Sequence, residues 1–126
     1  MNKILVVEDE KNLLKLYTSE LEDEGYSVIP LNNGKDVLKN IKASEPQVVV
    51  LDILLDDIEG LEVLEQIKNY DLNLPVILNT AYSTYKANFS TWIADEYVLK
   101  SPDLTELKSA IKKYVNINES LQEQGC

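Results

Sequence analysis

Short runs of apolar residues recur along this chain, and the run Val48–Leu51 ends directly at Asp52. An apolar run of this length without alternation is typical of a strand that is buried on both faces of a parallel sheet. Placing an ionisable side chain at the end of such a strand costs free energy. We therefore expect Asp52 to have a function.

Three other apolar runs also stop at charged or polar residues: 4–7 at Glu8 and Asp9, 76–79 at Thr80, and 97–99 at Lys100. In an open α/β sheet, ligands bind outside the carboxyl ends of the strands. The sequence therefore predicts that three carboxylates, one hydroxyl and one ammonium group converge at one edge. That set of groups suits a divalent cation beside a phosphoryl group.

Strand patterns alternate with helix patterns along the whole chain, which predicts an α/β fold with right-handed crossovers and helices on both faces of one parallel sheet. The first two strands are expected at residues 3–7 and 27–31, and the fourth follows Pro75. With 126 residues the chain is long enough for one domain and too short for two. We place the domain at residues 1–116 and interpret 117–126 as a frayed, polar C-terminal tail.

Residues 82–94 fit a helix poorly because serine, threonine and asparagine are frequent there. We expect a short or loose helix. Tyr85, Phe89 and Trp92 lie at i, i+4 and i+7, on one face of that helix. We favour packing of this face on the sheet, and the alternative is an exposed surface for docking a partner.

The net charge of −10 argues against some classes of partner. Phosphate contacts need clustered Lys and Arg, so the charge argues against direct nucleic-acid binding and against an anionic membrane surface. Histidine is absent and Cys126 is the single cysteine, which excludes Ser-His and Cys-His nucleophile pairs and argues against zinc. The first apolar run is too short for a signal peptide and no stretch reaches transmembrane length, so we expect a cytoplasmic protein.

The acidic residues have two interpretations. Glu8 and Asp9 alone fit a helix N-terminus, where acids interact favourably with the macrodipole. Together with Asp52, however, they would repel one another unless a cation lies between them, and oxygen ligands in a small open site favour Mg²⁺. Lys100 would either form ion pairs or neutralise a phosphoryl oxygen. Thr80 is either an ordinary strand-end hydroxyl or a hydrogen-bond donor to the same group.

A carboxylate that attacks phosphorus forms an aspartyl-phosphate. Such a nucleophile needs no general base, because carboxylates are ionised at neutral pH. Catalysis of phosphoryl transfer consists mostly of positioning and charge neutralisation. A site without histidine is therefore sufficient for this chemistry.

Five segments in order resemble the receiver domain of two-component response regulators: residues 4–10, 49–55, 58–62, 78–81 and 94–100. The resemblance covers about residues 2–116. It implies a chemotaxis-regulator-like fold, with a single doubly wound sheet of five parallel strands in the flavodoxin-like order 2-1-3-4-5 and helices on both faces.

The resemblance also implies roles for the residues at the strand ends. Asp52 would be the phospho-acceptor, and the protein ligands of Mg²⁺ would be Asp52, Asp9, Glu8 (partly through water) and the backbone carbonyl of Leu54. Lys100, Thr80 and the backbone N–H of Ala81 would contact the phosphoryl group. Thr80 and Tyr97 would form a switch pair that repacks the fourth helix, fifth strand and fifth helix.

The partners implied by the resemblance are a histidine kinase or phosphotransfer protein as donor, and a downstream protein or output domain at the repacked face. A homodimer that forms on phosphorylation is a further implication. The chain would catalyse only its own phosphorylation and dephosphorylation and would not otherwise be an enzyme.

Two departures from the family pattern affect the site. Asp56, followed by Asp57, stands where the family often has proline, so we expect a more acidic and less rigid loop. Ser101 separates Lys100 from Pro102, where the family usually has Lys-Pro with a cis bond. A cis Lys100–Ser101 bond would cost about 3 kcal/mol, so either that strain is retained or the loop takes another route.

Three other functions are open at this point. A phosphatase or phosphotransferase of the haloacid-dehalogenase type would need a second Asp at the position of Leu54. A flavodoxin-like module for a nucleotide or flavin would need a Gly-rich loop where the acidic residues follow the first strand. A receiver that only binds partners, without phosphorylation, is the third, and the complete set of acids argues against it.

The resemblance further suggests how long the phosphoryl group lasts. Leu54 and Tyr82 lie two positions after Asp52 and Thr80, where receiver side chains flank the path of the attacking water. Neither side chain orients water well, so we expect slow self-dephosphorylation.

Overall fold

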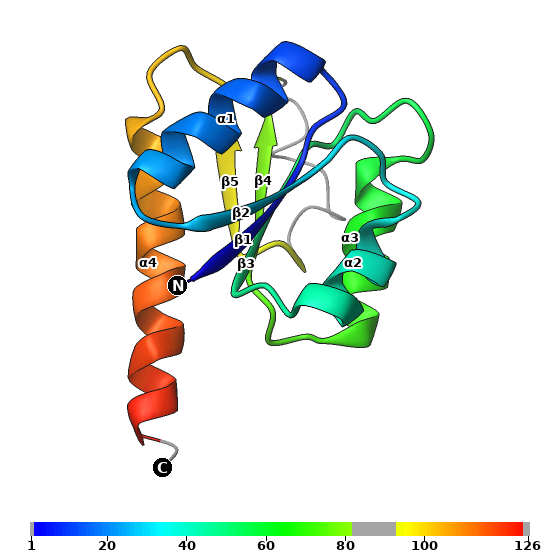
Figure 1. The fold of residues 1–126 in the computed structure, drawn as a ribbon. Helices are drawn as coiled ribbons and strands as arrows, with labels where there is room; N and C mark the ends of the chain where they lie inside the picture. The colour runs from blue at the N-terminus through cyan, green and yellow to red at the C-terminus, as the bar shows by residue number, and fades with distance from the viewer. Residues whose placement is uncertain (1, 82–92, 125–126) are drawn as a thin grey trace.

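The computed structural model describes residues 2–81 and 93–124. Its elements are β1 (Lys3–Val7), α1 (Lys11–Asp23), β2 (Ser27–Leu31), α2 (Val37–Ser44), β3 (Val48–Leu51), α3 (Gly60–Tyr70), β4 (Val76–Thr80), β5 (Glu96–Leu99) and α4 (Thr105–Gln124) (Figure 1). The alternation predicted from the sequence is thus present. The predictions for the loose helix and for the face formed by Tyr85, Phe89 and Trp92 concern residues outside the described part.

The five strands form one parallel sheet in the order β2-β1-β3-β4-β5, which is the order that the family resemblance implied. The register brings the last residues of adjacent strands together: Val7 pairs with Leu51, and Thr80 pairs with Leu99. The residues that follow these strands therefore leave the sheet along a single edge, which we call the carboxyl edge.

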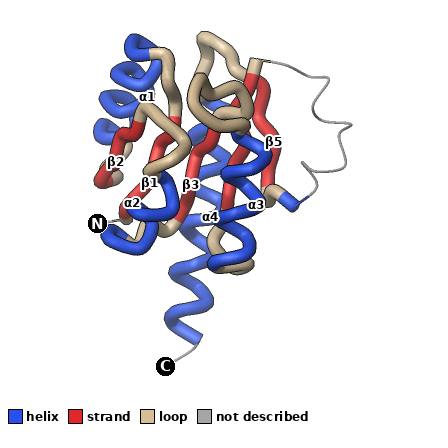
Figure 2. The backbone as a smooth tube through the Cα atoms, turned by 90° about the vertical axis from the view of Figure 1, so that its right-hand side faces the viewer, coloured by secondary structure: helices blue, strands red, loops and turns tan. Residues whose placement is uncertain are grey.

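Helices cover both faces of the sheet. The helices α1 and α4 lie on one face, and α2 and α3 lie on the other (Figures 1 and 2). Their apolar side chains pack against the sheet in two separate cores. Successive residues of β1 point to opposite faces, so Leu5 and Val7 join one core while Ile4 and Val6 join the other. Every residue of β3 and β4 is buried. Burial of whole strands in this way reflects a sheet that has helices on both sides.

The ends of the first two helices follow from local chemistry. Glu10 is the N-cap of α1, and its carboxylate accepts hydrogen bonds from the N–H groups of Asn12 and Leu13. Gly25, with φ of 95°, ends the same helix. Glu45 adopts a left-handed conformation directly after α2, just before Pro46. One of the three consecutive acids is therefore structural, which leaves Glu8 and Asp9 for the carboxyl edge.

The last helix is longer than the sequence analysis expected. We interpreted residues 117–126 as a frayed tail because they are polar, but α4 continues to Gln124 and projects beyond the sheet (Figure 2). No glycine or proline occurs between Thr105 and Gln124, so nothing in the local sequence breaks the helix. Among the described residues, no helix combines the length and apolar character needed to cross a membrane.

Candidate functional site

Three carboxylates meet at the carboxyl edge. Glu8 and Asp9 follow β1, and Asp52 follows β3, which pairs with β1. Each offers an oxygen atom, and these atoms all lie within 4.8 Å of one another. Glu8 and Asp52 are buried and Asp9 is half-buried. The structure thus brings together the three acids that the sequence placed at one site.

Lys100 joins this cluster from the end of β5. Its Nζ atom lies 2.5 Å from Glu8 Oε1 and 2.9 Å from Asp52 Oδ2. The backbone N–H of Lys100 donates to the Thr80 carbonyl over 2.7 Å, which continues the pairing of β4 and β5 past the last strand residue. The Lys100–Ser101 peptide is trans, like the other peptides of the described residues. Of the two alternatives for this loop, the structure has the route without a cis bond.

Thr80 and Ala81 occupy the end of β4. Thr80 is fully buried, and Ala81, which follows it, is exposed. Tyr97 is half-buried on β5 and packs against the core under α2 and α3. Since Tyr97 pairs with Leu78, alternation along β4 places Thr80 on the same face of the sheet as Tyr97. The predicted switch residues are thus on adjacent strands and on one face.

The loop between β3 and α3 lies against the carboxylates. The N–H of Leu54 donates to Asp52 Oδ1 over 3.2 Å, and the N–H of Asp56 donates to Asp9 Oδ2 over 2.9 Å. Gly60 closes the loop, because a Cβ atom there would lie 2.3 Å from the Asp52 carbonyl oxygen. The backbone that carries the predicted Leu54 carbonyl ligand is therefore held beside the three acids.

The charges at the carboxyl edge are not balanced. Burial raises the pKa of Glu8, although the bonds from Lys100 and from the Glu10 N–H oppose this effect. Burial alone would lower the pKa of Lys100, but its bonds to Glu8 and Asp52 raise it overall. One ammonium group faces three carboxylates, and the buried Glu8 Oε1 has only an ion pair, without a hydrogen bond of good geometry. Surplus negative charge on hard oxygen atoms fits Mg²⁺.

Sequence reasoning missed one contact of the loop between β3 and α3. The carboxylate of Asp57 accepts hydrogen bonds from the N–H groups of Gly34 and Lys35, just before α2. We had considered Asp57 only as a charge that makes the loop more acidic. No local pattern could have indicated this contact, since the partners are 22 and 23 residues away.

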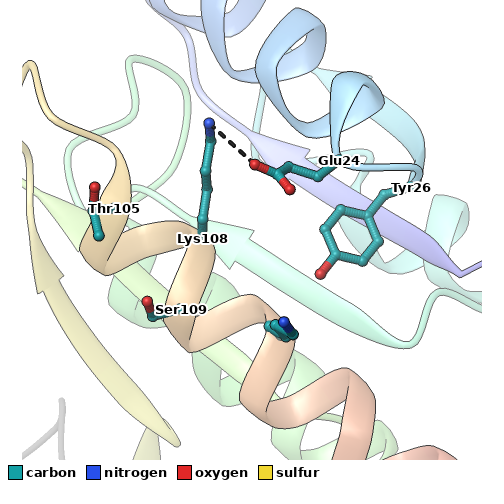
Figure 3. A pocket seen from close by; sticks show the side chains of 6 residues that line it. Glu24, Tyr26, Thr105, Lys108 and Ser109 are labelled. Atoms are coloured by element: carbon teal, nitrogen blue, oxygen red, sulfur yellow. Dashed lines mark ion pairs between the residues drawn. The ribbon is translucent and has the colours of Figure 1, made fainter.

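A hollow of about 320 Å³ lies between α4 and the end of α1 (Figure 3). Lys108 reaches across it to Glu24 at 3.4 Å and to Glu20 at 3.5 Å. Lys108 thus pairs with both of these glutamates. The residues that line it are Glu24, Tyr26, Thr105, Lys108, Ser109 and Lys112, none of which the sequence analysis assigned to the site. The hollow is thus separate from the carboxylate cluster.

The chain matches the family described as "Response regulator receiver domain" over residues 4–112. Similar curated proteins include the alkaline phosphatase synthesis transcriptional regulatory protein PhoP of Bacillus subtilis, 32% identical over 119 residues. Response regulator ArlR of Staphylococcus saprophyticus is 39% identical over 114 residues. These matches cover 93% and 89% of this chain but 50% and 51% of the relatives. The chain therefore spans about half the length of these curated relatives.

Solved structures agree with this match. Response regulator protein TrrA from Thermotoga maritima, in complex with Mg²⁺-BeF, has a TM-score of 0.88 and 43% identity, covering 90% of this chain and 99% of that one. A complex of histidine kinase ThkA with response regulator protein TrrA also matches, with a TM-score of 0.85 and 43% identity over 90% of this chain and 98% of that one.

Proposed function

This chain belongs to the family of response regulator receiver domains, and we propose that Asp52 is the residue that accepts the phosphoryl group, with Mg²⁺ bound beside it. The observation that carries this assignment is the position of Lys100, which contacts both Glu8 and Asp52 inside a cluster of three carboxylates. A carboxylate that ends a buried strand and lies beside a lysine can attack phosphorus and have the developing charge neutralised.

The proposed transfer forms one bond and breaks one bond. A carboxylate oxygen of Asp52 attacks the phosphorus of a phosphohistidine, on a histidine kinase or a phosphotransfer protein, and the phosphorus–nitrogen bond breaks. The histidine ring leaves with the electron pair of that bond. Bound Mg²⁺ would supply charge neutralisation at the phosphoryl oxygens. Lys100, the Thr80 hydroxyl and the Ala81 N–H would hold the same oxygens.

The proposed ligands of the cation come from two segments. Asp9 and Asp52 would bind it through carboxylate oxygens, Glu8 would contribute partly through water, and the Leu54 carbonyl would complete the set. Two properties support this proposal. The acids crowd together with a surplus of negative charge, and the Leu54 amide already lies at Asp52.

The proposed output of phosphorylation is a change of surface. The Thr80 hydroxyl would move toward the phosphoryl group, and Tyr97 would follow it inward. The face that changes would include β5, the fifth helix of the family, which is α4 here, and the segment before β5. It would bind a downstream protein or output domain, or a second copy of the chain. Receiver domains are signalling proteins, and we propose that this one catalyses only its own phosphorylation and dephosphorylation.

The test is labelling with a small phosphodonor. Acetyl phosphate with Mg²⁺ should add one phosphoryl group, detected by intact-protein mass spectrometry, and Asp52→Asn should abolish the addition. A control is Asp71→Asn, because Asp71 is an exposed acid beyond the end of α3, and it should be labelled like the parent. Equal labelling of Asp52→Asn and the parent would overturn the assignment.

Thermal melts test the metal assignment. At a Mg²⁺ concentration ten times the Kd, binding should raise the free energy of unfolding by about 1.4 kcal/mol. Asp9→Ala should lose most of this response, because it removes one carboxylate of the cluster. If Asp9→Ala responds to Mg²⁺ as strongly as the parent does, Asp9 is not a ligand.

A further inference from the structure

The loop between β3 and α3 is tied to a second loop, the one between β2 and α2. One oxygen of the Asp57 carboxylate accepts from the Gly34 N–H over 2.9 Å, and the other accepts from Gly34 and Lys35 over 3.1 and 3.0 Å. Consecutive backbone N–H groups of this kind form a concave site for anions. Here the anion is a side chain of the same chain. The hydrogen bonds from Gly34 and Lys35 also lower the pKa of Asp57, so the carboxylate stays charged.

Close packing accompanies these hydrogen bonds. A Cβ atom on Gly34 would lie 2.3 Å from Ile58 Cγ2 and 3.1 Å from Leu55 Cδ1. Only a residue without a side chain lets the two loops approach this closely. Leu55 and Ile58, which flank Asp57, pack against the core under α2 and α3. The hydrogen bonds of Asp57 are therefore accompanied by close apolar packing between the two loops.

The loop has a second polar tether, which depends on the state of the carboxylate cluster. The Asp56 N–H donates to Asp9 Oδ2, and Asp9 is also one of the proposed cation ligands. A cation at the site would compete for this carboxylate. The Asp57 tether uses no atom of the cluster, so a cation would not compete for the carboxylate that makes it.

We propose that Asp57 is a positioning residue that fixes the loop carrying the Leu54 carbonyl before the cation binds. Leu54 lies three residues before Asp57, and the tethers at Asp52, Asp9 and Gly34 leave little freedom between them. A ligand that is already in place loses less conformational freedom on binding, which raises affinity. The inference rests on the proposed function, because Leu54 is a metal ligand only there. It also corrects the expectation of a less rigid loop at Asp56 and Asp57.

The experiment measures Mg²⁺ affinity by isothermal titration calorimetry, well below the melting temperature. Asp57→Ala should raise the Kd by about tenfold, as is typical when a partner that orients a metal ligand is removed. Asp57→Asn retains one oxygen that faces the two amides, so its Kd should lie between those of the parent and Asp57→Ala. Amide resonances of Gly34 and Lys35 should shift and exchange faster in Asp57→Ala.

The matched control is Asp56→Ala. Asp56 is the adjacent exposed acid, and the substitution removes the same charge from the same loop while keeping the backbone N–H that binds Asp9. Its effect on the Kd measures the loss of charge alone. We expect that effect to be clearly smaller than the effect of Asp57→Ala. The amide resonances of Gly34 and Lys35 should stay as they are in the parent.

The outcomes separate this inference from the function it rests on. Equal Kd values for Asp56→Ala and Asp57→Ala would overturn the positioning role, and so would a lower melting temperature of Asp57→Ala with an unchanged Kd. In both cases the parent would still accept phosphate on Asp52. Failure of the parent to be labelled in Mg²⁺ would instead refute the proposed function, whatever the Asp57 variants do.

Discussion

Each end of the sheet has a lysine that contacts carboxylates, but the two lysines differ in how their charge is balanced. Lys100, at the carboxyl edge, has a side chain 17% exposed and faces Glu8 and Asp52, with Asp9 close by. Lys68, on α3 at the opposite edge, has a side chain 6% exposed and lies 2.6 Å from Asp95. One site has three carboxylates for one ammonium group, and the other has a single pair.

The Lys68 site is saturated. Its ammonium group donates to Asp95 Oδ2 and to the carbonyl oxygens of Leu72 and Leu74, which uses its three protons. Asp95 Oδ2 also accepts from the Val76 N–H, and the Asp95 carbonyl accepts from the Tyr114 hydroxyl. This site therefore joins α3, β4, α4 and the segment before β5.

The comparison indicates which property separates the proposed functional site from a structural one. A lysine with little exposed surface lies beside a carboxylate at both ends, so that contact alone does not mark function. The surplus of negative charge occurs at the carboxyl edge, where it favours a cation. The following predictions test whether the two lysines really have separate roles.

The largest expected effect is on phosphorylation. Lys100→Ala should slow labelling by acetyl phosphate at least about a hundredfold, because it removes a group that would stabilise charge on the phosphoryl oxygens. Lys68→Ala should be labelled at nearly the parent rate when assayed well below its melting temperature. The measurement is the initial rate of labelling by mass spectrometry. Similar rates for the two variants would contradict the separation of roles.

Stability should show the reverse pattern. Lys68→Ala should lower the free energy of unfolding by about 2 kcal/mol, because Asp95 and two carbonyl groups lose a charged donor. Mg²⁺ should not restore this loss. Lys100→Ala removes the ammonium group that faces the three carboxylates. Mg²⁺ should therefore recover much of the stability that this variant loses. Urea denaturation with EDTA and with Mg²⁺ distinguishes these cases, and a recovery of Lys68→Ala by Mg²⁺ would argue against two separate sites.

The sequence predicted the Lys100 site and missed the Lys68 site for a physical reason. Glu8, Asp52 and Lys100 end apolar runs, and strand register brings such ends together whatever the loops do. Lys68 and Asp95 are 27 residues apart and end no strand, so no periodic pattern relates them. The Asp57 contact was missed for the same reason. Contacts made by sheet geometry are visible in a sequence, whereas contacts between loops and helix ends depend on the folded positions of both partners.

The bounds of the elements could be predicted only where apolar patterns define them. The strands at Lys3–Val7 and Ser27–Leu31 were predicted with the bounds that the structure has, because apolar patterns define them. The polar C-terminal segment has no such pattern, so the sequence does not define where the last helix ends, and in the structure α4 continues to Gln124. Both routes past Ser101 fit the sequence, and the structure has the one with a trans peptide.

The pH dependence of stability should also differ between the two ends. Burial raises the pKa of Glu8 above its usual value of 4.5. A carboxyl group with a raised folded-state pKa stabilises the fold fully below its unfolded pKa, and this contribution is lost as the pH rises through the folded-state pKa. In EDTA, the parent should therefore lose stability relative to Glu8→Gln as the pH rises from 4.5 through the raised pKa of Glu8.

Urea denaturation of the parent and Glu8→Gln, from the usual pKa of a glutamate up to neutrality, measures this difference in stability. Mg²⁺ should reduce the difference by compensating the ionised carboxylate. For comparison, Lys68→Ala is introduced into both the parent and Glu8→Gln. The pH-dependent difference in stability between the two proteins should not change, because Lys68 lies at the other edge. A difference in stability that stays constant with pH would show that Glu8 is not destabilised by its burial.

The smallest expected effect concerns how long the phosphoryl group remains on Asp52, and it compares two leucines at opposite edges. Leu54 is 43% exposed and lies two residues after Asp52, whereas Leu72 is 73% exposed and lies at the Lys68 site. Hydrolysis needs a water molecule in line with the phosphorus, and a leucine side chain can neither donate nor accept a hydrogen bond to orient it.

Leu54→Asn should therefore speed the decay of phospho-Asp52 by about threefold, equivalent to about 0.7 kcal/mol of activation free energy. The double variant Leu54→Asn, Tyr82→Glu should decay faster still; Tyr82 is outside the described residues, so this step tests the sequence prediction alone. Leu72→Asn removes an exposed leucine far from the acceptor and should decay like the parent. If Leu54→Asn decays no faster than Leu72→Asn, Leu54 does not shield the phosphorus, and the expected slow dephosphorylation must have another cause.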